Sequence, residues 1–478
     1  MLFNTITFAI FLPIVLLLYW FLRHQKLVWQ NLLLLVASYF FYGCWDYRFL
    51  FLLIFSTSLD YYTGIKISEA SSIRWKKFWL YLSIVINLGF LSVFKYYNFF
   101  IENFVEGLSL LGVKSSLATL NIILPVGISF YTFHGLSYII DIYREKITPE
   151  RNLVNYSLFV SFFPLLVAGP IERATHLLPQ IRQKRIFNSQ TFNDGLKQIL
   201  WGLFKKVVIA DNCGVYVDSI FNDSAHQSGS TLVLGAILFS FQLYGDFSGY
   251  SDIALGTARL FGIELLKNFS FPYFSRDIAE FWRRWHMSLT TWFKDYVYIP
   301  LGGSKASKWF NIRNVFIIFI LSGIWHGASW KFVCWAMINA IYFLPLLLFQ
   351  KNRRHMEIVA YDRLYPTPKE VIQMVTTFML TVFSRIFFRA DDVHHAFAFI
   401  KGIFNESLFT FPQVWPVRVL LLIVAFMWVE WTGRRNGYAI ALSLKSMPVP
   451  VRWTFYYVLV FAIFYYSNSG EQFIYFQF

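Results

Sequence analysis

Apolar runs recur along most of the chain, and short polar stretches separate them. They begin near residues 4, 30, 48, 78, 121, 153, 196, 231, 313, 332, 371, 417 and 451. A helix needs roughly 20 apolar residues to cross the hydrocarbon core of a bilayer, and several runs are shorter than that. The pattern predicts an all-α, polytopic membrane protein with about ten or eleven transmembrane helices and several shorter helices inside the protein.

One short run carries information about its own placement. Leu153–Ala168 is followed by Gly169-Pro170 and then by a basic stretch from Arg173 to Lys206. If this run crossed the membrane, the basic stretch would lie outside, against the preference of Lys and Arg for cytoplasmic loops. We therefore expect a re-entrant or buried helix here.

The interval Lys267–Arg313 interrupts the apolar rhythm with eight basic and three acidic residues, interleaved with Trp and Phe. It is expected to be amphipathic and either to lie at the membrane surface or to fold back into the protein. The polar segment Gln350–Glu370 is expected to be a solvent-exposed linker. Since no internal repeat and no soluble domain is evident, the sequence predicts a single membrane domain over residues 1–478.

The composition supports this class and gives an orientation. Only 14% of the residues are charged and 57% are hydrophobic, whereas soluble domains carry about 25% charged residues. Met1–Trp20 lacks the features of a cleaved signal peptide, so it is expected to be a retained first span. Lys and Arg dominate the loops after the first and third runs, which places the N-terminus outside. These basic residues are Arg23, Lys26, Lys66, Arg74, Lys76 and Lys77.

The net charge of +15 does not indicate nucleic acid, because the basic residues cluster at the ends of apolar runs, where they meet anionic lipid headgroups. The charge is also compatible with attraction of an acidic cofactor such as coenzyme A. Cys44, Cys213 and Cys334 have no metal or redox spacing. They are expected to be small packing residues, and no metal site is predicted.

His326 lies inside a hydrophobic stretch, between Ser322-Gly323 and Gly327-Ala328-Ser329. Ionisable groups at membrane depth usually face a protein interior or a water-filled cavity and mark a functional path. The glycines weaken the helix locally, and the apolar stretch Arg313–Phe349 is long for one span. We expect it to turn near Trp330-Lys331 and to place His326 beside an internal cavity, where a neutral imidazole accepts a proton. The alternative is a core histidine bonded to a neighbouring helix.

His286 follows Trp282-Arg283-Arg284-Trp285, a pattern that is also typical of membrane-interface anchors. Its pairing with His326 favours a role in proton-transfer chemistry. A third cluster, from Gln242 to Asp252, holds Tyr244, Asp246, Ser248 and Asp252 at the end of an apolar run. Such groups are costly to bury without partners, so they either line a polar tunnel or tie a broken helix together.

Other chemistries are not supported. The chain has no G-x-S-x-G nucleophile elbow, no P-loop and no G-x-G-x-x-G motif. Asp391, Asp392, His394 and His395 could suggest a metal site, but helix capping at the start of an amphipathic stretch is the favoured interpretation.

These motifs together resemble the membrane-bound O-acyltransferase family, in the bacterial branch of the alginate O-acetyltransferase membrane subunit. The resemblance covers nearly the whole chain, and the Phe-Trp-Arg-Arg-Trp-His and Trp-His-Gly-Ala sequences are its most specific parts. The motifs are 124–133, 162–171, 246–252, 281–289, 295–303, 325–328, 387–390 and 473–478.

The resemblance implies a ring of transmembrane helices around a central tunnel, with His326 as the catalytic histidine and His286 as the second functional position. His326 would be the general base, and His286, with Arg283 or a backbone donor, would stabilise charge on the carbonyl oxygen. The residues expected to line the tunnel or bind substrate are Trp282, Arg283, Trp285, Tyr244, Asp246, Ser248, Ser322 and Trp325.

The implied reaction moves an acyl group, expected to be acetyl, from a cytoplasmic thioester to hydroxyls of an extracytoplasmic polysaccharide. The thioester would be acetyl-CoA or an acyl-carrier protein, with no bound cofactor. Transfer would be direct or through an esterase-like relay protein, in the bacterial cytoplasmic membrane. Two alternatives stay open at this point: a proton-coupled transporter and a non-catalytic assembly subunit.

Overall fold

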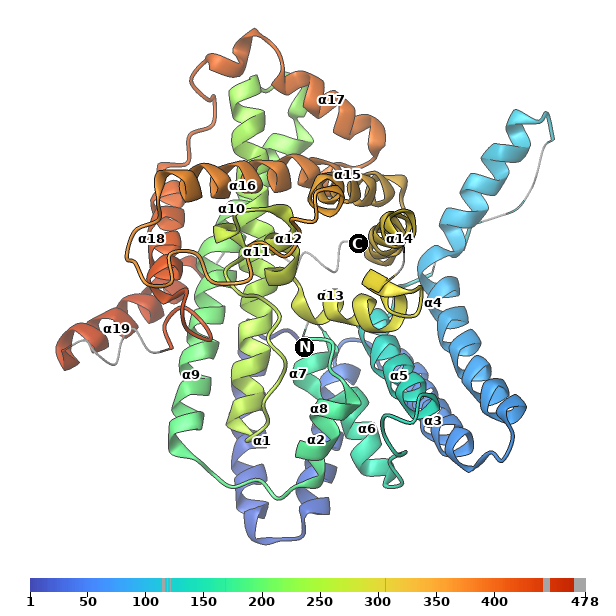
Figure 1. Ribbon diagram of the computed structural model, residues 1–478. Helices are drawn as coiled ribbons and strands as arrows, with labels where there is room; N and C mark the ends of the chain where they lie inside the picture. The colour runs from blue at the N-terminus through green and yellow to red at the C-terminus, as the bar shows by residue number, and fades with distance from the viewer. Residues whose placement is uncertain are drawn as a thin grey trace. The chain divides into compact units, whose positions relative to one another are not determined.

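The computed structural model describes residues 1–113, 117, 119–120, 122–167, 169–305, 307–441 and 448–467, and every regular element in these ranges is a helix (Figure 1). Within these ranges, six helices are long and apolar enough to cross a bilayer. They are Ile6–His24, Ile73–Leu110, Gly229–Leu260, Trp330–Leu348, Pro368–Arg389 and Val449–Tyr466. The prediction of an all-α, polytopic membrane protein is therefore confirmed.

The predicted number of spans is larger than six because it also counted runs whose helices are shorter or less apolar than these six. One of the shorter runs forms α2 (Leu27–Gly43), an apolar helix of 17 residues that falls just below the length of a full span. The total of ten or eleven spans, and their closure into a ring around a tunnel, stay predictions. The motif at 473–478 and Ala168 lie outside the described residues.

The helices belong to two compact units that alternate along the chain. The first consists of residues 1–193 and 257–266, and the second of residues 194–256 and 267–478. The single domain predicted over residues 1–478 stays a prediction.

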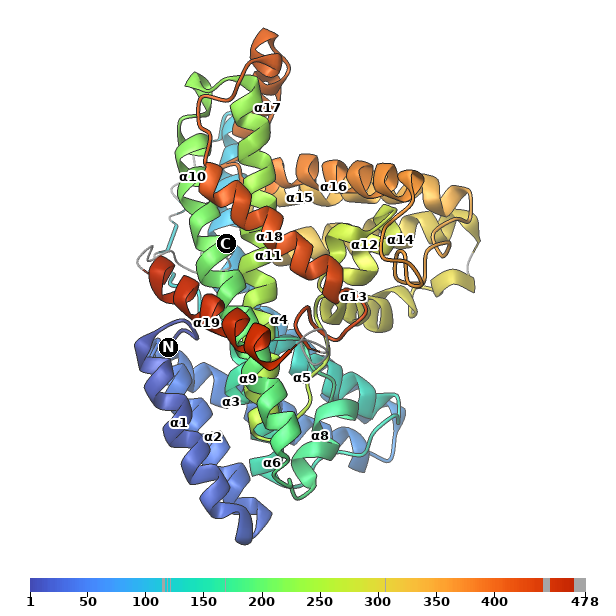
Figure 2. The same cartoon turned by 90° about the vertical axis from the view of Figure 1, so that its left-hand side faces the viewer.

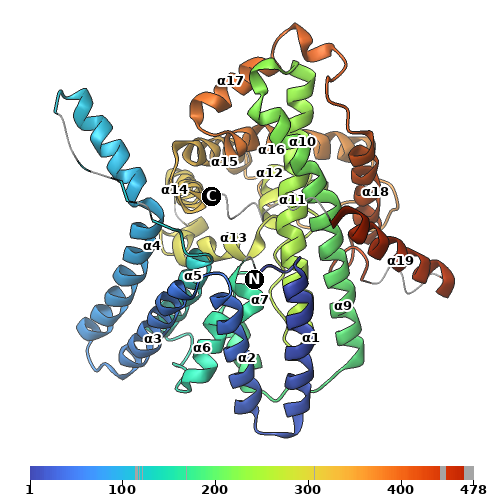
Figure 3. The ribbon, with the colours of Figure 1, turned by 180° about the vertical axis from the view of Figure 1, so that it is seen from behind.

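In the first unit, α1 and α2 form an antiparallel pair (Figures 2 and 3). Tyr19 of α1 anchors the pair, because its hydroxyl donates to the main-chain oxygen of Phe261 at 2.9 Å. The helices of this unit are α1 (Ile6–Phe21), α2, α3 (Tyr47–Glu69), α4 (Ile73–Leu110), α5 (Ile128–Tyr143), α6 (Leu153–Ser161), α7 (Phe163–Leu166) and α8 (Ala174–Arg182).

The short apolar run at Leu153 folds as predicted. It forms α6 and α7, of 9 and 4 residues, and every residue from Tyr156 to Val167 is buried. Neither helix is long enough to span a bilayer. The prediction of a buried helix before the basic stretch is confirmed.

The second unit contains most of α9 and α11 and all later elements. In Figure 1, α11 runs upright and α16 runs across it. The helices are α9 (Ser189–Leu203), the π-helical η2 (Phe204–Ala210), α10 (Asp211–Asn222), α11 (Gly229–Leu260), α12 (Ile278–Arg284), α13 (Met287–Phe293), α14 (Lys308–His326), α15 (Trp330–Leu348), α16 (Pro368–Arg389), α17 (Val393–Ile403), α18 (Val417–Gly433) and α19 (Val449–Tyr466).

Glycines bring α11 against the α9–η2 helix at very short range. A β-carbon on Gly249 would lie 2.8 Å from the main-chain oxygen of Gly202, and one on Gly256 would lie 2.5 Å from that of Gly195. Small residues allow this approach in membrane helices, where van der Waals contact drives association. The π-helical turn η2 begins at Phe204, directly after α9, and it carries Lys205 and Lys206.

Much of the interval Lys267–Arg313 folds back into the protein, the second of the two alternatives. Its short helices α12 and α13 bury apolar side chains such as Phe281 and Leu289, whereas Ile299 and Trp309 near the end of the interval are exposed. Glu280 fixes α12 by accepting bonds from Arg276 at 3.0 Å and from Arg284 at 2.9 Å. The pairing lets a strongly basic segment enter the interior.

Two smaller predictions need correction. The segment Gln350–Glu370 is more than an exposed linker, because Val359 and Ala360 are buried and Arg434 binds the main-chain oxygens of both. Among the cysteines, Cys213 is buried as expected, whereas Cys44 is exposed. The capping interpretation is confirmed at Asp392, whose side chain accepts from the first turn of α17.

We expect the substitution Gly249→Ala to lower the thermal stability of the purified protein. Alanine has the higher helix propensity, but its β-carbon would force the two helices apart, a kind of overpacking that costs about 1–3 kcal/mol. The melting temperature in detergent measures the effect. Gly89→Ala is the control, because a β-carbon there meets no atom within 4 Å. Equal melting temperatures for both variants would contradict the close approach.

Candidate active site

His326 is the last residue of α14, and the chain turns immediately after it. Gly327 is fully extended, with a φ of −174°, and α15 begins at Trp330. Gly323 allows α14 and α15 to pack tightly, since a β-carbon there would lie 2.5 Å from the main-chain oxygen of Phe332. The break predicted near Trp330-Lys331 is confirmed, a few residues earlier than expected.

The imidazole of His326 lies at a small cavity of about 20 Å³ with aromatic walls. Its ring centroid is 4.8 Å from that of Trp325, 5.1 Å from that of Trp335 and 5.1 Å from that of Phe388. The cavity is lined by Leu243, Phe281, Trp282, Trp285, His326, Trp335, Asn339, Thr381, Ser384, Arg385 and Phe388. Apolar walls with a few polar groups are typical of small-ligand sites.

Arg385 is a cavity residue that was not predicted. It comes from α16, is 4% exposed, and its guanidinium lies 4.4 Å from the ring centroid of Trp285. It also donates a hydrogen bond of 2.7 Å to the Tyr273 hydroxyl. A guanidinium stays charged at any physiological pH, so this cavity holds a fixed positive charge. An arginine inside an apolar span is a signal of the same kind as His326 and could have been found in the same way.

His286 lies between α12 and α13, and its backbone has a φ of +45°, in the left-handed region. The side chain is 2% exposed. Its Nδ1 lies 3.0 Å from Oδ1 of Asn268, and its ring is 5.9 Å from that of Trp325. Burial lowers the pKa of the imidazole to about 3, because the charged form loses its hydration. The ring of Trp325 lies next to both histidines, since it is 5.9 Å from that of His286 and 4.8 Å from that of His326.

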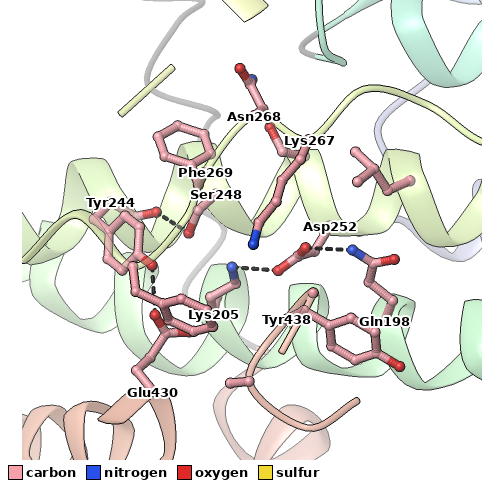
Figure 4. Close-up of a pocket in the computed structure, with 15 residues that line it drawn as sticks. Gln198, Lys205, Tyr244, Ser248, Asp252, Lys267, Asn268, Phe269, Glu430 and Tyr438 are labelled. Atoms are coloured by element: carbon pink, nitrogen blue, oxygen red, sulfur yellow. Dashed lines mark hydrogen bonds and ion pairs between the residues drawn. The ribbon is translucent and has the colours of Figure 1, made fainter. Parts of the chain in front are cut away.

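A second small cavity, also of about 20 Å³, lies beside Asn268 and is lined mainly by polar side chains (Figure 4). Lys205 pairs with Asp252 at 2.5 Å, and Tyr244 donates to Glu430 at 2.6 Å. Burial lowers the pKa of Lys267 to about 8. The lining consists of Gln198, Lys205, Tyr244, Ser248, Ser251, Asp252, Leu255, Lys267, Asn268, Phe269, Phe271, Glu430, Gly437, Tyr438 and Ala439.

Some predicted site residues lie elsewhere. Arg283 donates to the main-chain oxygens of Asn352 and His355, at 2.6 and 2.8 Å. Ser322 is buried in α14 and lines neither cavity. Trp282 and Trp285 line the cavity of His326, whereas Tyr244 and Ser248 line the polar one.

Asp246 also lies outside the two cavities, and the broken-helix interpretation of its cluster is wrong. The helix α11 runs without a break from Gly229 to Leu260. Asp246 instead lies 2.8 Å from the ammonium of Lys206, which is also 2.7 Å from Asp211. The lysine is 1% exposed, so these carboxylates compensate a deeply buried charge.

Comparisons with known proteins identify relatives of the chain. The model of MBOAT, the membrane-bound O-acyltransferase family, matches residues 143–390. The chain is 36% identical to the probable alginate O-acetylase AlgI of Pseudomonas syringae pv. tomato over 435 residues, 90% of this chain and 80% of that protein. It is 35% identical to the peptidoglycan O-acetyltransferase of Helicobacter pylori over 432 residues, 84% and 80% of the two chains.

A more distant relative is the teichoic acid D-alanyltransferase of Bacillus subtilis. It is 27% identical over 290 residues, which cover 58% of this chain and 71% of that protein.

We expect Asp246→Leu to destabilise the protein strongly, by about 3–5 kcal/mol, because it removes one of the counter-charges of buried Lys206. The double variant Lys206→Met/Asp246→Leu should recover part of the lost stability. In that variant the buried ammonium of Lys206 is absent, so no buried cation is left without the carboxylate of Asp246. Thermal unfolding in detergent measures both. Asp223→Leu is the control, because the two side chains of its ion pair with His226 are 55% and 83% exposed. A double variant no more stable than Asp246→Leu would contradict the pairing.

Proposed function

Because the chain belongs to the membrane-bound O-acyltransferase family, we propose that it transfers an acetyl group from a thioester to hydroxyls of an extracytoplasmic polysaccharide. The observation that carries this proposal is the imidazole of His326 at the break between α14 and α15, beside a cavity with aromatic walls. An acyltransferase of this family needs a base for the acceptor hydroxyl, and this imidazole is suited to the role.

The proposed reaction forms an ester bond and breaks a thioester bond. His326 accepts the proton of the acceptor hydroxyl, whose oxygen attacks the thioester carbonyl carbon. The carbon–sulfur bond then breaks, and the thiolate leaves as a thiol after it receives that proton. No metal or redox partner is needed to balance this step.

The negative charge that develops on the carbonyl oxygen needs a positive partner. Arg283 was expected to help here, but its guanidinium binds loop carbonyls. We assign the role instead to Arg385, which lines the same cavity as His326. A fixed cation in a site with apolar walls stabilises such charge far more than it would in water.

The substrates are proposed from the relatives and from the charge pattern. Relatives named for O-acetylation share 35–36% identity with the chain, against 27% for the D-alanyltransferase, which favours acetyl. We propose acetyl-CoA as the donor, with an acyl-carrier thioester as the alternative, delivered from the cytoplasm. The acceptor is a polysaccharide such as alginate or peptidoglycan, reached directly or through an esterase-like relay protein.

The proposed location is the bacterial cytoplasmic membrane, with the N-terminus outside. The support is the excess of Lys and Arg in the loops after the first and third apolar runs. In this orientation the donor and the acceptor approach from opposite sides of the membrane.

We expect His326→Ala to abolish base-labile acetate in envelope and secreted glycans of cells that express the protein. Removal of a general base typically costs about 10²–10⁴ in rate. Ester analysis is compared among wild type, His326→Ala and an empty vector, with protein levels matched. His226→Ala is the control, because that histidine is exposed and pairs with the exposed loop residue Asp223. Acetylation that persists in His326→Ala would refute the assignment of the base.

A further inference from the structure

A hydrogen bond to a neighbouring side chain holds the imidazole of His286. It joins Nδ1 of the ring to Oδ1 of Asn268, at 3.0 Å. Both side chains are almost fully buried, with 2% and 1% exposed. The other ring nitrogen, Nε2, is buried and makes no hydrogen bond within the described part of the chain. A buried polar atom without a partner is rare in proteins and suggests that a ligand supplies one.

The amide of Asn268 is itself fixed from several sides. Its Oδ1 also accepts from the Ser288 hydroxyl at 3.0 Å, and its Nδ2 donates to the Ser251 hydroxyl at 3.1 Å. Its main-chain oxygen accepts from the amide of Met287 at 2.8 Å. Figure 4 shows the amide turned away from the paired side chains of Lys205 and Asp252. In this arrangement the oxygen, and not the amide nitrogen, faces Nδ1 of His286.

The identity of that atom determines where the hydrogen of the imidazole is. An amide oxygen only accepts, so the bond needs a hydrogen on Nδ1 of His286. A neutral imidazole carries one N–H, and the hydrogen bond of one nitrogen determines the role of the other. With the hydrogen on Nδ1, Nε2 carries a lone pair. The low pKa of the ring keeps it neutral at physiological pH.

We propose that Asn268 is a positioning residue that holds His286 in the tautomer with hydrogen on Nδ1, so that Nε2 accepts a hydrogen bond from an O–H or N–H group of the bound reactants. His286 then cannot donate to the carbonyl oxygen of the thioester, the role expected from the sequence. The inference deepens the proposed function, on which it rests for the identity of the reactants. The tautomer itself does not depend on that function.

The tautomer is measured directly by ¹⁵N NMR of the full chain labelled at histidine, with the His286 signals assigned by their loss in His286→Asn. We expect a protonated Nδ1 and an unprotonated Nε2 in the wild type, unchanged between roughly pH 5 and 8. In Asn268→Leu the preference for this tautomer is lost. A wild-type protein with hydrogen on Nε2 would overturn the proposal, whether or not the protein transfers acetyl groups.

Two substitutions of Asn268 separate positioning from simple packing. Asn268→Leu removes the oxygen, and we expect kcat of acetyl transfer to fall about 10–100-fold, as for other partners that orient a functional histidine, with little change in KM. Asn268→Asp keeps an oxygen against Nδ1 and should retain most of kcat. The carboxylate of this variant raises the pKa of His286. Because only the neutral ring can accept a hydrogen bond at Nε2, the acidic limb of the kcat/KM profile should move to higher pH.

Asn87→Leu is the matched control, because Asn87 is an equally buried amide that hydrogen-bonds Asp60 and Ser83 of the first unit. It should lower thermal stability without changing the tautomer or the pH profile. An Asn268→Asp variant less active than Asn268→Leu would contradict the proposal. Failure of the wild type to transfer acetyl would instead count against the proposed function, and the NMR measurement would still decide the tautomer.

Discussion

The interior of a membrane protein offers a charged side chain almost no water, so each buried charge has to find its partner within the fold. In the second unit this constraint decides the local structure. Lys206 lies between Asp211 and Asp246, and Lys205 pairs with Asp252. Two neighbouring lysines reach carboxylates on one helix, α11, because they sit on a π-helical turn and because glycines bring the two helices into contact. π-helical turns are frequent at functional sites.

The same constraint orients the basic segment that carries His286. Glu280 forms ion pairs with Arg276 and Arg284. The loop after α15 binds Arg283 through its main-chain oxygens. With these cations paired, Phe281, Trp282 and Trp285 of the same segment line the cavity of His326. The arginines thus hold the segment in place, and the aromatic residues between them shape the site.

The sequence predicted those features that depend on neighbouring residues. The short helices at Leu153 follow from the length of the run, and the break after His326 follows from its flanking glycines and serines. The features it missed join residues far apart in the chain. Arg385 binds Tyr273, 112 positions away, and Tyr244 binds Glu430, 186 positions away. The contacts of Arg283 were missed for the same reason. Nothing near Arg283 in the sequence indicates that it binds the main-chain oxygens of a loop about 70 positions later.

The two histidines share one further property, which links backbone conformation to the proposed chemistry. His286 holds a left-handed backbone, a conformation that costs a residue other than glycine of order 1–3 kcal/mol. His326 ends its helix directly before an extended glycine. Each imidazole is thus presented from an irregular point of the chain beside helices that are tightly packed. Strained backbone of the kind that His286 adopts clusters at active sites and ligand clamps. This observation supports the proposed site over the alternative of two histidines that merely fill a core.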